Sequence, residues 1–222
     1  MYIGITLLFH YFYCMLPFTL QQPAGNTDIY LLDQIIKERY GENDIVLDAG
    51  CGMGRNLHWF LINHIACYGI DMDVQAIGKL KLQNPFLPEH RLQVCLVESM
   101  PFADGFFDHV ISSAVLHFAN GHEQFNTMLT EMVRVLKPGG TLFIRMTSDI
   151  GIENTIVSIA NGVYLIPDGS TRFLLTRALL AKLLTGHHLT LIEPLKTVNV
   201  DDIRCMTTMV MKKDGNNHVQ LK

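Results

Sequence analysis

The sequence predicts an α/β protein of three layers, in which helices cover both faces of a doubly wound, mostly parallel sheet of seven strands. Short apolar runs alternate along the chain with segments whose apolar residues recur at helical spacing. Most strand cores are apolar throughout, as expected for strands that are buried on both faces. The last two runs are joined by only a few residues, which indicates an antiparallel hairpin at one edge of the sheet.

The first half of the chain alternates in this way from residue 26 onward. Residues 26–28 offer helix caps, and apolar residues at helical spacing follow from Ile29 to Tyr40, before Gly41 ends the helix. The next elements are predicted as strands at 45–47, 66–70 and 92–97 and as helices at 56–62 and 74–82.

The second half continues the pattern and then becomes less regular. A strand at 110–113 and a helix at 124–136 lead to Lys137-Pro138-Gly139-Gly140, which we expect to end the helix with a tight reversal. The remaining predictions are a strand at 141–146, helices at 148–161 and 176–184, a loop at 162–171, and strands at 189–198 and 205–212 with a turn at 199–202.

Length and composition predict one well-cored domain. The chain has 222 residues, of which 49% are hydrophobic and 17% charged, and this excludes a disordered protein. We expect the domain to span 26–213, with an N-terminal extension at 1–25, a substrate-cap insertion near 147–173 and a tail at 214–222. The formal net charge is -4 without a basic block, so nucleic acid is not an expected partner.

The cysteines and histidines indicate neither a disulfide framework nor a metal site. Five cysteines at irregular spacing, with no CxxC pair, favour reduced thiols and a cytoplasmic protein. The ten histidines include no HExxH motif, so no metal is expected.

The N-terminal segment MYIGITLLFHYFYCMLPF is apolar but has the features of neither a signal peptide nor a membrane span. It carries no Lys or Arg before its apolar core, and His10 and Pro17 interrupt it. We therefore expect no stable membrane insertion. An alternative is that Met15 is the natural first residue and that residues 1–14 are an upstream extension.

The stretch LDAGCGMGRNL, residues 47–57, points to a bound cofactor. Glycine-rich turns that follow a strand cradle cofactors, but the dinucleotide pattern G-x-G-x-x-G would need its third glycine at Arg55, one position after Gly54. A phosphate-binding Gly-Lys-Ser/Thr ending is also absent. The acid Asp48 at the strand end would repel a pyrophosphate and suits a ligand that carries positive charge.

Four motifs follow one another in order: this glycine turn, the acid of GIDMD at Asp71, the segment LVESMPF and the KPGG turn. With them the chain, over about residues 28–146, resembles the class I S-adenosylmethionine-dependent methyltransferases that act on small molecules. The resemblance implies a Rossmann-like fold whose sheet ends in a reversed strand. It also implies S-adenosylmethionine as cofactor and transfer of its methyl group to an acceptor by in-line displacement.

The resemblance assigns cofactor roles to residues in the first two motifs. It places Gly50 and Gly52 under the cofactor, where a Cβ would displace it, and Asp48 near its amino-acid end. Cys51 is expected to bind the cofactor as a packed turn residue and not as a nucleophile. Asp71 lies 71 - 48 = 23 positions after Asp48, where an acid accepts both ribose hydroxyls. Met72 is expected beside the adenine, whereas Asp73 caps the next helix.

The later motifs leave two roles open. The acid that the family often carries five positions before the proline is Leu96 here, so either Glu98 or main-chain groups contact the adenine. A carbonyl near Ser113 is expected to accept a hydrogen bond from the cofactor's ammonium. His117 either touches the substrate, as the candidate catalytic residue, or only packs against the cofactor.

The acceptor is predicted to be a small, partly apolar molecule. Arg145, Tyr164 and Arg172 are the candidate substrate-binding residues, although each arginine could equally form a surface ion pair. A hydroxyl or an acidic carbon would need a base, for which His117 or His122 could serve. Two other functions stay open: a non-catalytic S-adenosylmethionine-binding protein of the same fold, and an NAD-dependent oxidoreductase.

Overall fold

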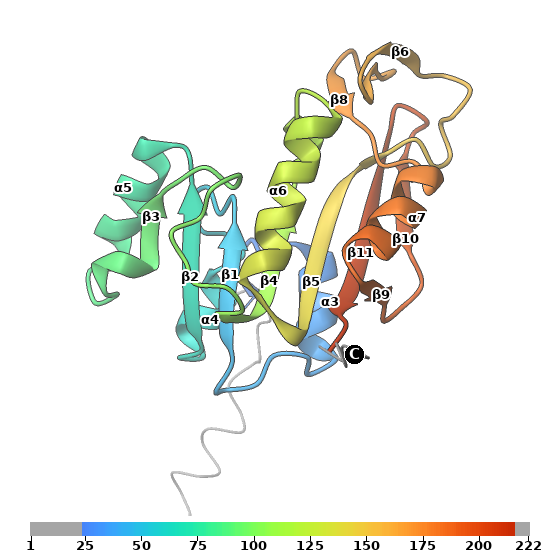
Figure 1. Cartoon of the computed structure of the whole chain (residues 1–222). Helices are drawn as coiled ribbons and strands as arrows, with labels where there is room; N and C mark the ends of the chain where they lie inside the picture. The colour runs from blue at the N-terminus through green and yellow to red at the C-terminus, as the bar shows by residue number, and fades with distance from the viewer. Residues whose placement is uncertain (1–23, 216–222) are drawn as a thin grey trace, which may run out of the picture.

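Residues 24–215 are described by a computed structural model (Figure 1). The predictions for residues 1–23, including the membrane prediction and the choice of first methionine, lie outside the described residues. The helices are α3 (Ile29–Ile36), α4 (His58–Ile62), α5 (Val74–Gln83), α6 (His122–Val135) and α7 (Arg177–Gly186), with 3₁₀ turns η1 (Glu89–Arg91) and η2 (Leu116–Phe118). The strands are β1 (Ile45–Ala49), β2 (Ala66–Asp71), β3 (Leu92–Val94), β4 (Phe107–Ser113), β5 (Leu136–Ser148), β6 (Val157–Ala160), β7 (Val163–Leu165), β8 (Thr171–Phe173), β9 (Leu189–Leu191), β10 (Lys196–Val200) and β11 (Arg204–Lys213).

The main sheet has the order β10-β11-β5-β4-β1-β2-β3, and β9 also pairs with β11. Strands β1 to β5 are parallel to one another, whereas β11 is antiparallel to β5, β9 and β10. The predicted fold class and the antiparallel edge hairpin are therefore confirmed. The sheet holds eight strands instead of seven, because residues 192–195 divide the predicted strand 189–198 into β9 and β10.

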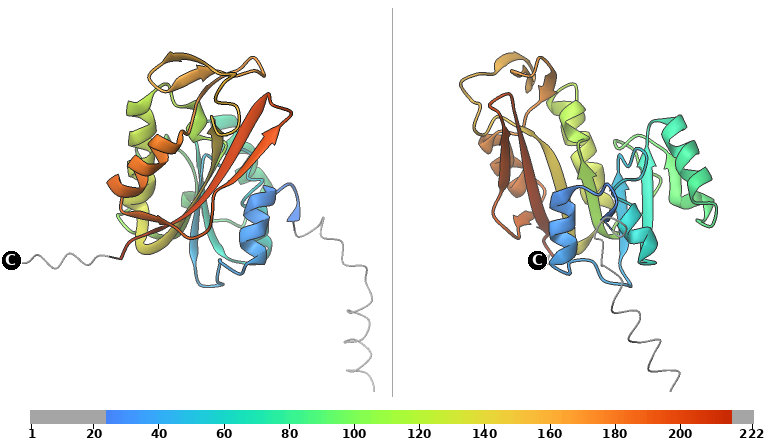
Figure 2. Two further views of the ribbon diagram at one scale, coloured as in Figure 1. Left: turned by 90° about the vertical axis from the view of Figure 1, so that its right-hand side faces the viewer. Right: turned by 180° about the vertical axis from the view of Figure 1, so that it is seen from behind.

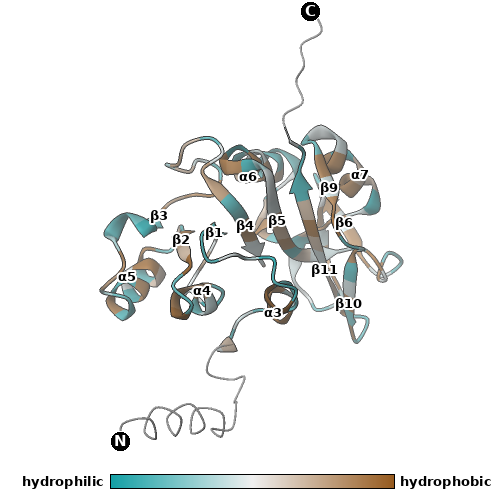
Figure 3. Cartoon of the chain, turned by 90° about the horizontal axis from the view of Figure 1, so that it is seen from below, coloured by the Kyte–Doolittle hydropathy of each residue, from teal (hydrophilic) through white to brown (hydrophobic). Residues whose placement is uncertain are grey.

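Helices cover both faces of this sheet, as Figures 2 and 3 show from behind and from below. One face packs against α6 and α7 through residues such as Phe125, Leu129 and Leu183. The other packs against α3, α4 and α5 through residues such as Leu31 and Phe60. Burial of apolar side chains on both faces explains why the strand cores are apolar throughout.

Side chains at the helix starts fix where three helices begin. Asp28 accepts a hydrogen bond from the Tyr30 N–H, Asp73 accepts from the Gln75 and Ala76 N–H groups, and Thr176 accepts from the Leu179 N–H. Each bond satisfies a backbone donor that a helix start leaves without an intrahelical partner. The predicted cap at Asp73 is confirmed, and α3 is shorter than predicted, since it ends at Ile36.

The predictions of a helix at 148–161 and of a loop at 162–171 are wrong. Strands β6, β7 and β8 form a separate three-stranded antiparallel sheet in this segment. Asn161 and Gly162 join β6 to β7 with φ values of 50° and 85°, the left-handed conformation of a two-residue hairpin turn. The Asn-Gly pair between two apolar runs thus indicated the hairpin correctly, whereas the helical spacing of apolar residues at 148–161 indicated a helix that does not form.

The predicted reversal at Lys137-Pro138-Gly139-Gly140 is wrong as well, although α6 does end before it. The segment lies inside β5, where the pairing with β4 shifts between Phe107–Leu136 and His109–Thr141. It is therefore a bulge, in which the φ of Gly139 is 80° and a Cβ on Gly140 would lie 2.7 Å from the Asp108 carbonyl oxygen.

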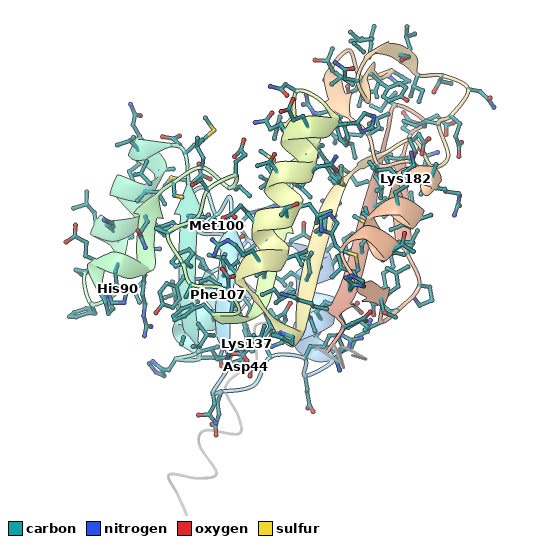
Figure 4. The ribbon with its side chains drawn as sticks, in the orientation of Figure 1. Asp44, His90, Met100, Phe107, Lys137 and Lys182 are labelled. Carbon is teal, nitrogen blue, oxygen red and sulfur yellow. The ribbon has the colours of Figure 1, made fainter. Side chains whose placement is uncertain are left out.

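The amino end of the parallel sheet carries a closed polar network. His109 bonds Asp44 at 2.9 Å and Thr141 at 2.6 Å, and Lys137 bonds both carboxyl oxygens of Asp108 at 2.8 Å. Figure 4 shows Asp44 and Lys137 together at this lower end, away from the small sheet β6–β8. These groups satisfy one another, which indicates a structural role.

Within residues 24–215, the helices are too short or too polar for any of them to cross a bilayer.

Candidate functional site

A cavity of about 340 Å³ opens at the carboxyl ends of β1, β2 and β4 and beside the segment after β3. This is the end of an open parallel sheet at which α/β proteins bind ligands. Its walls include four of the predicted cofactor residues, namely Gly50, Asp71, Met72 and Glu98. The remaining walls are Cys95, Leu96, Val97, Ala114, Val115, Phe118, Gln124 and Met128.

The glycine turn beside this cavity has a left-handed backbone conformation, which residues with side chains rarely adopt. Gly50 has φ 86°, and a Cβ there would lie 2.3 Å from Val115 Cγ2. Gly52 has φ 51° and faces open space, so only its conformation excludes a side chain. The Gly50 and Cys51 N–H groups both donate to the Ile70 carbonyl, at 2.8 and 2.9 Å, which ties the turn to β2.

Asp48 lies directly behind this turn, with 1% of its surface exposed. Neither of its carboxyl oxygens has a hydrogen-bond partner within residues 24–215. Burial raises the pKa of Asp48 to about 7, and nearby Arg55 opposes this effect. A buried carboxyl group without a partner is costly, and it favours a ligand that supplies a positive charge or a donor.

Asp71 lines the cavity at the end of β2, and both of its carboxyl oxygens accept backbone bonds. The Gly52 N–H donates to Oδ2 at 2.8 Å, and the Asp73 N–H donates to Oδ1 at 2.9 Å. These bonds hold the carboxylate in one orientation at the rim. Met72, next to it, is 71% exposed and contributes an apolar wall.

Glu98 lines the cavity together with Gln124 of α6, whose Nε2 donates to Glu98 Oε1 at 2.6 Å. The bond joins the loop after β3 to α6 across the cavity wall. Leu96, at the position where the family often carries an acid, lines the same wall and is 52% exposed.

Ser113, at the end of β4, belongs to a polar cluster that sequence reasoning missed. Ser113 Oγ donates to Asp28 Oδ2 at 3.2 Å, and Arg145 and Arg55 lie 3.3 and 3.5 Å from the same oxygen. Arg145 also lies over the Tyr30 ring at 5.1 Å. Asp28 thus caps α3 and binds the ends of β4 and β5, a role that its sequence position does not reveal.

A second cavity, of about 320 Å³, adjoins the first and shares Ala114 and Phe118 with it. It brings together the predicted residues His117, Arg145 and Arg172, and it adds Arg204 of β11, which sequence reasoning also missed. Thr147, Val200 and Met206 complete its walls. Ala114 has φ 63°, a left-handed conformation that is strained for a residue with a side chain and recurs at functional sites.

His117 lines this second cavity, and the bond made by its Nδ1 fixes which ring nitrogen carries the proton. The Thr147 N–H donates to His117 Nδ1 at 3.3 Å, and a ring nitrogen that accepts carries no hydrogen. The proton of the neutral ring therefore lies on Nε2. Burial, reinforced by the charges of Arg172, Arg204 and Arg145, lowers the pKa of His117 to about 4.

Tyr164 and His122 lie away from both cavities. They line a third cavity of about 460 Å³, together with Lys182 and His187 of the α7 region. His122 packs against Phe173 at 5.2 Å between ring centroids. The structure thus separates Tyr164 from the two arginines with which the sequence grouped it, and it separates His122 from the predicted site of transfer.

Cys51 is buried behind the glycine turn, and burial raises the pKa of its thiol well above the ordinary range. Cys67, Cys95 and Cys205 are free, like Cys51. Among residues 24–215, no group of three or more His, Cys, Asp or Glu side chains could hold a metal ion.

The comparisons with known proteins agree on one kind of domain. Residues 47–144 match the model of the methyltransferase domain family. An uncharacterized methyltransferase of Synechocystis is 33% identical over 95 residues, which cover 43% of each chain. A tRNA (carboxymethyluridine(34)-5-O)-methyltransferase of Arabidopsis thaliana is 31% identical over 107 residues, 48% of this chain and 25% of that protein.

A solved structure shares the fold over most of the chain. The N-methyltransferase NodS of Bradyrhizobium japonicum, in complex with S-adenosyl-L-homocysteine, has a TM-score of 0.62 and 19% identity, covering 83% of this chain and 84% of that one. The matches to curated relatives such as those of Encephalitozoon cuniculi, Synechocystis and Methanocaldococcus jannaschii span less than half of their length. The matched segment and the shared fold lead to one assignment: residues 47–144 resemble the methyltransferase domain, and the chain has the Rossmann-like fold of solved S-adenosylmethionine-dependent methyltransferases.

Proposed function

We propose that this chain transfers the methyl group of S-adenosylmethionine to a small-molecule acceptor by in-line displacement. The observation that carries the proposal is the first cavity, which joins the Gly50 turn to the Asp71 carboxylate at the carboxyl edge of the sheet. The methyltransferase-domain match of residues 47–144 supports the same reaction.

The residues present fit this cofactor better than a dinucleotide. Gly50 lines the cavity, and its φ of 86° together with the close contact to Val115 permits only glycine at this turn. The buried, unpartnered carboxyl of Asp48 suits an ammonium or sulfonium charge and would repel a pyrophosphate. Asp71 would hold the ribose through its carboxylate, and Met72, Leu96 and Glu98 would enclose the adenine.

Bound S-adenosylmethionine would supply a methyl group that its sulfonium already activates. The task of this chain is then to orient the two reactants and to exclude water. Orientation alone is worth roughly 7–11 kcal/mol of the barrier in well-aligned reactions. The strained Ala114 and the ring of Phe118, which line both cavities, lie where the two reactants would meet.

The acceptor in this proposal is a small molecule, and the reaction takes place in the cytoplasm. The second cavity, of about 320 Å³, suits a small group, and the free cysteines suit a reducing compartment. RNA is the second candidate acceptor, because the similar Arabidopsis protein is named for methylation of a tRNA carboxymethyluridine. The net charge of -4 disfavours it, since RNA binding depends on basic surfaces.

Calorimetric titration with S-adenosylhomocysteine, with NADH as the comparison, tests the cofactor. We expect micromolar binding of the first and none of the second. Binding of NADH alone would replace the proposal by an oxidoreductase. Transfer of label from radioactive S-adenosylmethionine then tests turnover, and binding without transfer to any acceptor would favour a non-catalytic cofactor-binding protein.

A further inference from the structure

The second cavity has an excess of positive charge beside the proposed point of transfer. Its lining residues include Arg145, Arg172 and Arg204, which come from three different strands. Asp28 lies 3.3 Å from Arg145, and Asp168 lies 3.7 Å from Arg204. Within residues 24–215, no carboxylate forms an ion pair with Arg172.

Some N–H groups of these arginines have no hydrogen-bond acceptor among the described residues. Arg145 Nε is buried and has no hydrogen-bond partner within residues 24–215. Arg172 lies over the Phe118 ring at 4.9 Å, and its one hydrogen bond, to its neighbour's Thr171 carbonyl, uses Nη1. The ring supports the plane of the guanidinium and leaves its other donors available.

Among residues 24–215, the titratable groups that line this cavity are the three arginines and His117. None of them can act as a base near neutral pH, because the arginines stay protonated and the free nitrogen of His117 carries a hydrogen. An acceptor that must lose a proton, such as a hydroxyl or an acidic carbon, finds no group here to take it. The donors instead suit an acceptor that arrives as an anion.

We propose that the second cavity binds a small-molecule carboxylate and that a carboxylate oxygen accepts the methyl group, which forms a methyl ester. The planar guanidinium fork matches the two oxygens of a carboxylate. The new bond joins oxygen to the methyl carbon, the sulfur–methyl bond breaks with its electron pair left on sulfur, and no proton is transferred. The inference rests on the proposed methyl transfer from S-adenosylmethionine.

The direct test is the alkali lability of the product. The full chain is incubated with S-adenosylmethionine labelled in its methyl group and with a small-molecule extract of the cells that make the protein. Mild alkali releases a methyl ester as volatile methanol, whereas methyl groups on nitrogen, carbon or an ether oxygen stay bound. We expect volatile label, and label that survives alkali would overturn the inference but leave the proposed function intact.

Two other outcomes separate the inference from the function on which it rests. No transferred label in any fraction would overturn the proposed function, and the inference with it. A parallel incubation with RNA covers the second candidate acceptor. Ester label that is recovered only in RNA would overturn the assignment to a small molecule.

The matched variants are Arg172→Met and Arg177→Met. Arg172 lines the cavity, whereas Arg177 is an exposed arginine at the start of α7. Methionine keeps the apolar stem and removes the charge in both. We expect Arg172→Met to lower ester formation at least tenfold at low acceptor concentration, Arg172→Lys to restore part of it, and Arg177→Met to change it less than twofold. Equal rates in the two methionine variants would contradict the inference.

A binding measurement without turnover excludes the remaining explanation, that these arginines hold the cofactor's own carboxylate. S-adenosylhomocysteine is titrated calorimetrically into wild type, Arg172→Met and Arg204→Met. We expect Kd values within twofold of one another, because both arginines line the second cavity and not the first. A tenfold loss of S-adenosylhomocysteine affinity in both variants would assign them to the cofactor and overturn the inference.

Discussion

Asp48 and Asp71 lie 23 positions apart in the chain, and their carboxyl groups differ in how many hydrogen bonds they accept. Asp71 accepts two backbone hydrogen bonds, whereas the carboxyl oxygens of Asp48 have no partner within residues 24–215. At the residue scale, the Asp71 carboxylate is therefore already held in a fixed orientation before a ligand binds. The Asp48 carboxyl group is buried, so ionising it lowers the stability of the folded protein, and this loss of stability depends on pH.

We expect Asp48→Asn to stabilise the ligand-free protein increasingly as pH rises from 4 to 8. Burial raises the folded-state pKa of Asp48 to about 7, so wild type loses stability as pH rises between its unfolded value, near 4, and 7. The loss is at most about 4 kcal/mol, because each pH unit between the unfolded and folded pKa values contributes about 1.4 kcal/mol. Urea unfolding of both proteins at pH 4, 6 and 8 measures the difference.

Glu42→Gln is the control for this series, since Glu42 is an exposed carboxylate at the other end of β1. Its stability relative to wild type should change little with pH. A difference between Asp48→Asn and wild type that stays constant from pH 4 to 8 would show that Asp48 has the same pKa in the folded and unfolded protein, which would contradict the expected shift.

Asp71→Ala should weaken the binding of S-adenosylhomocysteine by about 1.5–3 kcal/mol, the usual range for hydrogen bonds to a charged group. Asp73→Ala is the matched control, because Asp73 caps α5 and does not line the cavity. Asp73→Ala should lower the stability of the protein and leave the Kd for S-adenosylhomocysteine unchanged. Calorimetry that gives equal Kd values for wild type and Asp71→Ala would remove Asp71 from the ribose site.

At the element scale, the small sheet β6–β8 is joined to the main sheet at several points. The Leu175 N–H donates to the Thr147 carbonyl at 3.0 Å, and the Asp168 N–H donates to the Ile203 carbonyl at 3.2 Å. Strand β8 places Arg172 in the second cavity. The geometry of that cavity therefore depends on the hairpin between β6 and β7.

Gly162→Ala should destabilise this hairpin more than Gly169→Ala destabilises its own turn. Both glycines have φ above 80°, but a Cβ at Gly162 would lie 2.5 Å from Phe173 Cε2, whereas a Cβ at Gly169 meets nothing within 4 Å. We expect about 1 kcal/mol from backbone strain at Gly169 and a further 1–3 kcal/mol at Gly162. Thermal unfolding and amide exchange of β6–β8 measure both, and equal losses would contradict the packing argument.

At the scale of the whole molecule, the cofactor cavity lies at the carboxyl ends of the parallel strands, whereas hydrogen bonds join Asp44 to His109 and Asp108 to Lys137 at the amino ends. Because the cofactor cavity is built from segments that follow four strands, a ligand there binds only the folded chain. Binding should therefore stabilise the entire fold.

S-adenosylhomocysteine at about 100 times its Kd should stabilise the protein by about 2.7 kcal/mol. For a chain of this size that free energy corresponds to a rise in Tm of about 5–10 °C. Differential scanning calorimetry with and without the ligand measures the shift, with NADH at the same concentration as the control. A rise in Tm that NADH matches would point to non-specific stabilisation.

Local patterns predicted the alternating elements, the caps and the glycine turn, because those features depend on residues that are close in the chain. Residues brought together by the sheet were less accessible. Asp28 bonds Ser113 across 85 positions, and Arg204 reaches the cavity only because β11 pairs with β5 in the observed register. The missed hairpin at Asn161-Gly162 differs from these, since its local turn signal was present and a helical spacing was preferred to it.

The wall that Ala114 and Phe118 form between the two cavities has a thermodynamic consequence. Two ligands that touch opposite sides of one wall bind independently only if neither of them moves it. Arg172 rests on the Phe118 ring, so a charge that draws Arg172 toward an anion also alters the wall that the other ligand meets. Any such coupling is reciprocal: the factor by which an acceptor changes the cofactor's Kd equals the factor by which the cofactor changes the acceptor's Kd.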